Sequence, residues 1–298
     1  MACQLLRIEC LDQNNNGRFF YVRVAFFGND IFLDCFRYLV DGEDYEMLKL
    51  FSVAYGEQEY DLAQSTRWLA RELGLPVQTT PALPRDLEAL NLQGCEAIIS
   101  AGYAHKIPPS CGGALRYAVN IHPSLLPRGA GPMPLPWVIL KGLEQTGVTI
   151  HKLAETWDGG DLLLQESFPL SGGENVEELL VKSQSLALKL LDRFLREPDT
   201  YWHRATPQLL SDREYWPRLT PQDCQIDWTW ELEKIGRHLR IYRYASPDGE
   251  VEFITDVASS RTQHLHVPGA LLGVDGEQRK VAAKDGIISF RVRKKRPV

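Results

Sequence analysis

Two short apolar runs constrain the fold more than any other feature of this sequence. The first is Val22–Phe27, which ends at Gly28-Asn29-Asp30 and precedes a segment, 31–40, that we expect to be helical; the second is Ala97–Ala101. A buried strand that leads through a glycine turn into a helix is the usual start of a doubly wound parallel sheet. We therefore predict an α/β fold built on a Rossmann-like, doubly wound and mostly parallel sheet.

The turn after the first strand carries two polar residues, Asn29 and Asp30, and lacks the Gly-x-Gly-x-x-Gly pattern of dinucleotide-binding proteins. At the carboxyl end of a strand, these side chains could contact a substrate or cap the following helix. Capping is the favoured interpretation.

A third strand is expected to carry candidate catalytic residues. Val119 closes an apolar stretch, which places Asn120 and His122 at the end of this strand. Because side chains alternate along a strand, the two lie on the same face. Pro123 and Pro127 prevent the segment from continuing as regular helix or central strand.

A carboxylate follows downstream in Trp157-Asp158-Gly159-Gly160, a turn flexible enough to approach other groups closely. Taken alone, Asn-x-His is usually a polar pair at a strand end and Asp-Gly-Gly is usually a turn. Together, an amide, an imidazole and a carboxylate can orient a carbonyl, move a proton and stabilise an oxyanion.

The run from Asn120 to Gln165 resembles the folate-dependent formyltransferases, which carry Asn-x-His-x-Ser-Leu-Leu-Pro and a later Asp in a glycine turn. The resemblance extends over nearly everything after residue 20. It implies an enzyme that transfers a formyl group from 10-formyltetrahydrofolate, with Asn120, His122 and Asp158 as the catalytic residues and without a metal. One departure is Trp157, where the family usually has Leu; this should change the packing of the turn and leave the carboxylate in place.

The resemblance also implies a folate pocket. Its expected residues are Gly102, Tyr103 and Ile107 after the second apolar run, together with Glu155 and Trp157 beside Asp158. For Tyr103 a core aromatic residue is an equally good interpretation. His105 and Lys106 are interpreted as surface residues, and His151 as a packed or exposed strand histidine.

The pattern of elements predicts three parts: an N-terminal extension over 1–20, a catalytic domain over 21–205, and a linker with a C-terminal domain over 206–298. Long helical stretches are expected at 174–196 and 231–239. Beyond the latter, short strands alternate with turns at 247–249, 268–269, 275–276 and 285–286. This predicts a small open β-barrel, similar to the C-terminal domain of methionyl-tRNA formyltransferases.

The amino-acid composition is that of an ordinary soluble globular protein. The 298 residues are 44% hydrophobic and 24% charged, with a net charge of −6, which argues mildly against a dedicated nucleic-acid binder. The six cysteines form no Cys-x-x-Cys pair, so we expect reduced thiols in a cytoplasmic protein. No apolar run reaches the length of a membrane span, and the start does not resemble a signal peptide.

The acceptor amine is suggested by charge. Methionyl-tRNA formyltransferases carry a Lys/Arg-rich insertion after the second strand, whereas Leu50–Thr66 contains no Lys or Arg and three carboxylates. Acidic residues repel a polyphosphate, and the basic run Arg291–Arg296 is typical of a solvated terminus. We therefore expect a small amine as substrate, either an amino-sugar nucleotide or a natural-product or siderophore amine. The alternatives are a methionyl-tRNA formyltransferase, a 10-formyltetrahydrofolate hydrolase and a folate-binding scaffold; the oligomeric state stays open.

Overall fold

The computed structural model describes residues 22–53, 65–108, 114–220, 222–241 and 251–294. The expected extension 1–20, most of the acidic stretch Leu50–Thr66 and the end of the basic run Arg291–Arg296 lie outside these residues.

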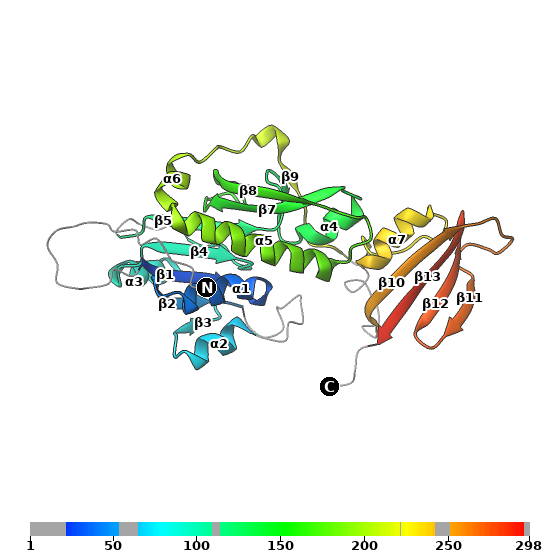
Figure 1. Cartoon of the computed structure of the whole chain (residues 1–298), viewed down its shortest axis with the longest axis horizontal. Helices are drawn as coiled ribbons and strands as arrows, with labels where there is room; N and C mark the ends of the chain where they lie inside the picture. The colour runs from blue at the N-terminus through cyan, green and yellow to red at the C-terminus, as the bar shows by residue number, and fades with distance from the viewer. Residues whose placement is uncertain (1–21, 54–64, 109–113, 221, 242–250, 295–298) are drawn as a thin grey trace, which may run out of the picture.

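A seven-stranded sheet forms the larger part of the molecule (Figure 1). Its strands, in the order β3-β2-β1-β4-β5-β7-β8, are β3 Val77–Gln78, β2 Tyr45–Phe51, β1 Val22–Gly28, β4 Ala97–Ala101, β5 Tyr117–His122, β7 Gln145–Lys152 and β8 Leu162–Pro169. The five from β3 to β5 are parallel, and β7 and β8 are antiparallel to their neighbours. The prediction of a doubly wound, mostly parallel sheet is confirmed.

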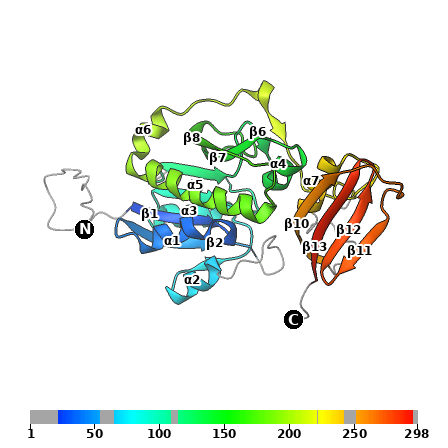
Figure 2. The same cartoon turned by 45° about the vertical axis from the view of Figure 1, so that its right-hand side comes forward.

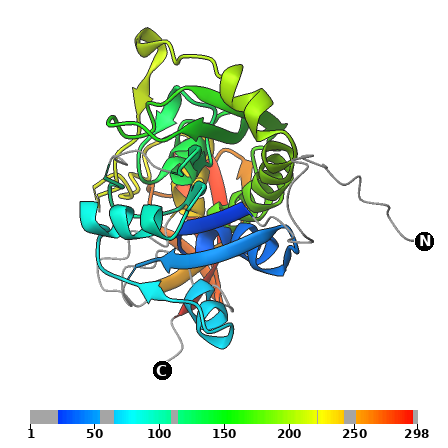
Figure 3. The same ribbon diagram turned by 90° about the vertical axis from the view of Figure 1, so that its left-hand side faces the viewer.

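Helices cover both faces of this sheet, as Figure 3 shows with α5 Val176–Arg196 on one side and α3 Pro84–Leu92 on the other. Alternation along each strand divides the core between them. Val24 and Phe26 pack with α5 and with α1 Leu33–Asp41, whereas Ala25 and Phe27 pack towards α3. Because Val119 and Ile121 belong to the first core, Asn120 and His122 share the opposite face, as predicted.

The remaining helices agree with the sequence except at their starts. A short 3-10 turn, η1 Asp30–Phe32, precedes α1, and α2 Thr66–Glu72 begins after the Ser65 cap. Asn29 accepts a hydrogen bond from the Ile31 amide, so the favoured capping role is confirmed. The other helices are α4 Pro134–Leu140, α6 Pro198–His203 and α7 Leu232–Arg240.

The C-terminal part is an antiparallel sheet in the order β10-β13-β12-β11, with α7 packed on one face. Its strands are β10 Val251–Arg261, β11 Leu271–Asp275, β12 Gln278–Ala283 and β13 Gly286–Lys294. This arrangement is consistent with the expected barrel-like domain. Figure 2 shows α7 beside α4, which joins the two parts of the molecule.

The segment between the two parts passes from α6 beyond the edge strand β8 and returns at β9 (Figure 1). Thr206 bridges to Leu162 through two backbone hydrogen bonds, and η2 Leu210–Asp212 follows. Then β9 Glu214–Tyr215 pairs in parallel with β6 Arg128–Ala130, directly after the Asn120–Pro127 motif. The expected linker thus lies against the residues around the candidate site, while the boundary near 205 stays a prediction.

Among the described residues, three cysteines (Cys35, Cys95 and Cys224) are buried free thiols. Within the same residues, no helix is long and apolar enough to cross a membrane.

Candidate active site

The strand-borne half of the site is fixed by the register of the sheet. Asn120 on β5 lies opposite Ser100 of β4 on one side and opposite His151 of β7 on the other. His122 is paired with Thr149 in the same antiparallel register. Since β5 is a central strand, its backbone is paired on both sides at Asn120 and with β7 at His122.

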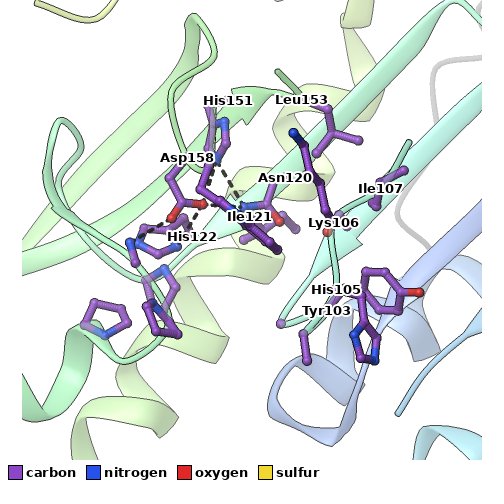
Figure 4. A pocket seen from close by; sticks show the side chains of 18 of the residues that line it. Tyr103, His105, Lys106, Ile107, Asn120, Ile121, His122, His151, Leu153 and Asp158 are labelled. Carbon is purple, nitrogen blue, oxygen red and sulfur yellow. Dashed lines mark hydrogen bonds and ion pairs between the residues drawn. The ribbon is translucent and has the colours of Figure 1, made fainter. Parts of the chain in front are cut away.

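His151 is a packed strand histidine, one of the two positions expected, and it also contacts two of the predicted catalytic residues. It is packed, with 2% of its side chain exposed, but its Nε2 lies 3.1 Å from Asn120 Nδ2 and 3.7 Å from Asp158 Oδ1. Figure 4 shows Asn120, His122, His151 and Asp158 converging. Only the pairing of β7 with β5 brings His151 there, and nothing local to Gly147–Leu153 indicates it.

The carboxylate of Asp158 comes from a turn rather than from a strand. Asp158 has a backbone φ of +52°, a left-handed conformation that costs free energy for a residue with a Cβ. Gly160 is required two residues later, because a Cβ there would overlap the carbonyl oxygen of Lys152. The side chain of Asp158 is also held, because the amide of Gly131 donates a hydrogen bond to its Oδ2 at 2.8 Å.

The hydrogen bonds assign the tautomers of both histidines. His122 Nε2 lies 2.7 Å from the Gly129 carbonyl, which can only accept, so Nε2 carries a proton. His122 Nδ1 is then the basic nitrogen, and it lies 3.7 Å from Asp158 Oδ1. In His151, Nδ1 donates to the Lys152 carbonyl at 2.8 Å, so Nε2 accepts from the amide of Asn120.

The amide of Asn120 is engaged within the site. Its nitrogen donates to His151 Nε2 at 3.1 Å and approaches Asp158 Oδ1 at 3.4 Å. Donation by Asn120 to an oxyanion, the role expected from the sequence, therefore requires that one of these contacts be exchanged. That role stays a prediction.

Asp158 is ionised despite being buried, with 9% of its side chain exposed. Burial raises its pKa, but attraction to the protonated form of His122, the contact with His151 and the Gly131 amide lower the pKa by more. The net result is a pKa well below the usual range of an aspartate. The site thus holds a fixed negative charge beside the basic nitrogen of His122.

These residues line a pocket of about 360 Å³. Along the same pocket lie all five residues expected to bind folate, namely Gly102, Tyr103, Ile107, Glu155 and Trp157. In Figure 4, Tyr103 and Ile107 lie across the pocket from His122 and Asp158. The structure thus brings every predicted site residue together, and their individual roles stay predictions.

Some lining residues differ from what the sequence suggested. Tyr103 is also a core residue: its hydroxyl accepts a hydrogen bond from the Ala82 amide, and its ring meets Phe27 edge-on. His105 and Lys106, expected at the surface, line the pocket. Trp157 lies at the rim, with 49% of its surface exposed.

Further lining residues were not predicted at all. They come from the loop after β6, the start of α4, β9 and the segment after β9, and they are Gly131, Pro132, Pro134, Leu135, Tyr215 and Arg218. Asn29 also lines the pocket, whereas Asp30 is turned away and accepts hydrogen bonds from Thr66. Within the described residues, no group of three or more His, Cys, Asp or Glu side chains is placed to hold a metal ion.

Comparison with known proteins identifies the family of this site. Residues 77–195 match the formyl transferase family model, a range that contains β4, β5 and all three predicted catalytic residues. This match and the relatives described next support assignment to the folate-dependent formyltransferases. A methionyl-tRNA formyltransferase from Coprothermobacter proteolyticus is 34% identical over 174 residues, which cover 58% of this chain and 57% of that protein. Another, from Streptococcus sanguinis, is 26% identical over 91% of this chain and 90% of its own length.

Two solved structures share the fold. An N-formyltransferase from Helicobacter canadensis, in complex with folinic acid and dTDP-3-aminofucose, superposes with a TM-score of 0.66 at 16% identity, over 92% of this chain and 100% of its own. HypX from Aquifex aeolicus, in complex with tetrahydrofolic acid, gives a TM-score of 0.65 at 18% identity, over 92% of this chain and 44% of its own. The match over 92% of this chain in both cases means that the C-terminal part is included in the shared architecture.

Proposed function

We propose that this formyltransferase moves the formyl group of 10-formyltetrahydrofolate to a primary amine. One observation carries the proposal: an ionised, buried Asp158 lies beside the basic Nδ1 of His122 at the bottom of a pocket. A positioned base beside a carboxylate is the arrangement that acyl transfer to an amine needs. The proposal also uses the ligands of the Helicobacter and Aquifex structures, folinic acid and tetrahydrofolic acid, both of which are folates.

The donor is proposed to lie between Gly102–Ile107 and Glu155–Asp158. Both segments line the pocket, and Ile107 and Leu153 give it apolar walls. A pocket of this kind needs only a few polar groups to fix the orientation of a pterin ring. Backbone amides and carbonyls of the two segments would supply them.

The amine attacks as its free base, although an alkyl ammonium has a pKa of about 10. Attack on the formyl carbon forms the new C–N bond and an oxyanion, and His122 Nδ1 takes the proton that the amine nitrogen loses. The charge of Asp158 stabilises the imidazolium that results. When the bond to the folate nitrogen breaks, the proton passes to that nitrogen, leaving a formamide and tetrahydrofolate.

The acceptor is proposed to be a small amine, such as an amino-sugar nucleotide or a natural-product or siderophore amine. Two of the cations close to the catalytic loops pair with carboxylates: Lys141 with Glu214 at 2.6 Å, and Lys152 with Asp161 at 3.3 Å. Paired cations contribute less to binding a nucleic acid, which normally requires several phosphates to be neutralised. The fold shared with the Helicobacter enzyme, which was solved with an amino-sugar nucleotide, is compatible with such an acceptor.

Methionyl-tRNA is the second candidate acceptor, because the curated relatives above are methionyl-tRNA formyltransferases. The two acceptors differ in their expected response to salt. Transfer to a small amine should depend little on ionic strength, whereas transfer to tRNA should fall steeply as salt is raised.

The test is incubation of the full chain with 10-formyltetrahydrofolate and a panel of amines that includes charged initiator tRNA. Formylation of a small amine with little salt dependence is the expected result. Efficient, salt-sensitive formylation of tRNA would select the second candidate. Release of formate without any amine would instead indicate a hydrolase, and folate binding without product would contradict the proposed transfer.

A further inference from the structure

The segment Thr206–Arg218, which we call the clasp, contacts the backbone of both loops that carry the site. It lies beyond the 77–195 range of the family match, and its sequence suggests only a linker. At one end Gln208 reaches the turn of Asp158, and at the other Trp216 reaches the loop after His122. The clasp is therefore placed to fix the distance between the two halves of the site.

The contacts to the Asp158 turn are hydrogen bonds to carbonyl oxygens. Gln208 Nε2 donates to the carbonyls of Asp158 at 2.8 Å and of Gly160 at 2.7 Å. Arg213 Nη2 donates to the carbonyl of Trp157 at 2.8 Å. Three carbonyls within four residues of this turn are thus bound by the clasp.

The contacts to the other loop come through β9 and Trp216. The amide of Trp216 donates to the Ala130 carbonyl at 2.7 Å, and the ring of Trp216 lies so close to Gly129 that a Cβ there would collide with it. The carbonyl of Gly129 is the partner of His122 Nε2. This end of the clasp thus packs on the residue that sets the tautomer of His122.

We propose that Gln208 is a positioning residue for catalysis: by tying the carbonyls of Asp158 and Gly160, it holds the Asp158 carboxylate at its place beside His122. The turn needs such a restraint, because Asp158 adopts a left-handed backbone and Gly160 closes tightly on Lys152. Sequence-local bonds are few here: Gly159 bonds back to Thr156, and Lys152 bonds to Asp161. Gln208 itself lies outside the set of residues that line the pocket, so it acts through Asp158.

This inference rests on the proposed formyl transfer, and its test separates the two. Gln208→Met keeps the approximate volume of the side chain and removes both donors, whereas Gln208→Lys restores a donor to the carbonyls. We expect Gln208→Met to lower kcat by about 10-fold or more and to change KM for the folate donor by less than about two-fold, because misplacing a reacting group affects the chemical step. Gln208→Lys should recover part of the loss.

The discriminating measurement is a double-mutant cycle with Asp158→Asn. If Gln208 acts through the Asp158 carboxylate, Gln208→Met should lower kcat by less than about two-fold in the Asp158→Asn background. The same 10-fold loss in both backgrounds, or a Gln208→Met enzyme with the wild-type kcat, would overturn the proposal. Gln78→Met is the matched control, since Gln78 Nε2 also approaches two backbone carbonyls, those of Thr80 and Pro81, and it does not line the pocket.

Hydrogen exchange supplies a second readout that does not need turnover. The amides of residues 156–161 should exchange faster in Gln208→Met and at the wild-type rate in Gln78→Met. If the wild-type chain forms no product with any acceptor, the proposed function fails, and exchange alone then decides the role of Gln208. Unchanged exchange over 156–161 in Gln208→Met would overturn it.

Discussion

The two halves of the active site are held in different ways. Asn120, His122 and His151 lie on β5 and β7, where each strand is paired on both sides within the seven-stranded sheet. Asp158 lies on a turn with a left-handed backbone, and most of its support comes from residues about 50 positions further along the chain. The strand half is therefore positioned by the fold itself, and the turn half by an added segment.

This difference predicts which positions around the site tolerate amino-acid substitutions. A sheet register permits substitution of neighbouring side chains as long as alternation is kept. The turn half depends instead on a few individual groups, namely Gly160, Gly131 and Gln208. Single substitutions should accordingly damage the turn half at more positions than the strand half.

The largest effects are expected at the two residues where the halves meet. His122→Ala and Asp158→Asn should each lower turnover by at least about 100-fold, the usual scale for a lost acid–base group. Both residues lie at a pocket, so circular dichroism and thermal unfolding should show a folded protein. Near-wild-type turnover in either variant would remove it from the catalytic set.

Gly160→Ala should break the turn half without touching a catalytic side chain. The added Cβ overlaps the Lys152 carbonyl, so the turn must move, at a cost of about 1–3 kcal/mol in stability and with a loss of turnover of about 10-fold or more. Urea unfolding and steady-state kinetics measure the two effects. Gly173→Ala is the matched control: it meets only the Ser171 hydroxyl, at 3.7 Å, and should be close to wild type. Equal behaviour of the two variants would mean that the turn is not tightly held.

His151→Phe tests the strand half. The ring loses the acceptor nitrogen that binds the Asn120 amide, and we expect turnover to fall by about 10-fold, because Asn120 is then free to turn away from Asp158. His203→Phe is a control, since His203 is exposed on α6 and its Nδ1 bonds the Asp199 carbonyl, away from the site. If kinetics show His151→Phe to be as active as His203→Phe, His151 is structural only.

The turn before α5 contrasts with the Asp158 turn, because a nearby carboxylate, that of Glu174, stabilises it. This carboxylate accepts hydrogen bonds from the amides of Ser171 and Gly172 and pairs with Lys182 at 2.8 Å. Burial raises the pKa of Glu174, but Lys182 and the backbone amides lower it by more, to about 2. Glu174→Gln should therefore cost about 2 kcal/mol at pH 7, with kcat unchanged.

The pH dependence of that cost follows from the sign of the shift. The folded pKa lies below the unfolded value of about 4.3, so the carboxylate stabilises the folded chain fully above about pH 5, and the contribution is lost as the pH falls towards 2. In urea titrations, the stabilities of wild type and Glu174→Gln should converge as the pH is lowered from 7 to 3. A constant difference across this range would contradict the assignment.

The sequence predicts the strand half of the site better than the turn half. Asn120 and His122 could be placed on one face because strand alternation and the following prolines are local signals. Asp158 was found through the family resemblance, since its left-handed backbone has no signature beyond the glycines that follow it. His151 was expected as a strand histidine, but its contacts with Asn120 and Asp158 were not predicted, because they depend on the antiparallel register of β7 against β5, which no local pattern encodes.

Gln208 was missed for a related reason. The residues from 206 to 217 show neither helical nor strand periodicity, and their course follows from long-range contacts with Leu162 and with β6. The parallel sheet, the long α5 and the C-terminal strands were all predicted because their periodic patterns extend over enough residues to identify each element. Irregular segments are positioned by their tertiary contacts, and these contacts leave no periodic pattern in the sequence.

The pairing of β9 with β6 also decides how such enzymes can be recombined. A chimera that joins one relative's catalytic half to another's C-terminal half at residue 196 or 205 would inherit the three site residues from one parent and the clasp from the other. The two site loops would then be contacted by clasp side chains from the other parent, whose distances need not match these loops. A junction placed after Leu219 would take the clasp and both loops from the same parent. The contact between α4 and α7 would then be the main interface formed by residues of different parents.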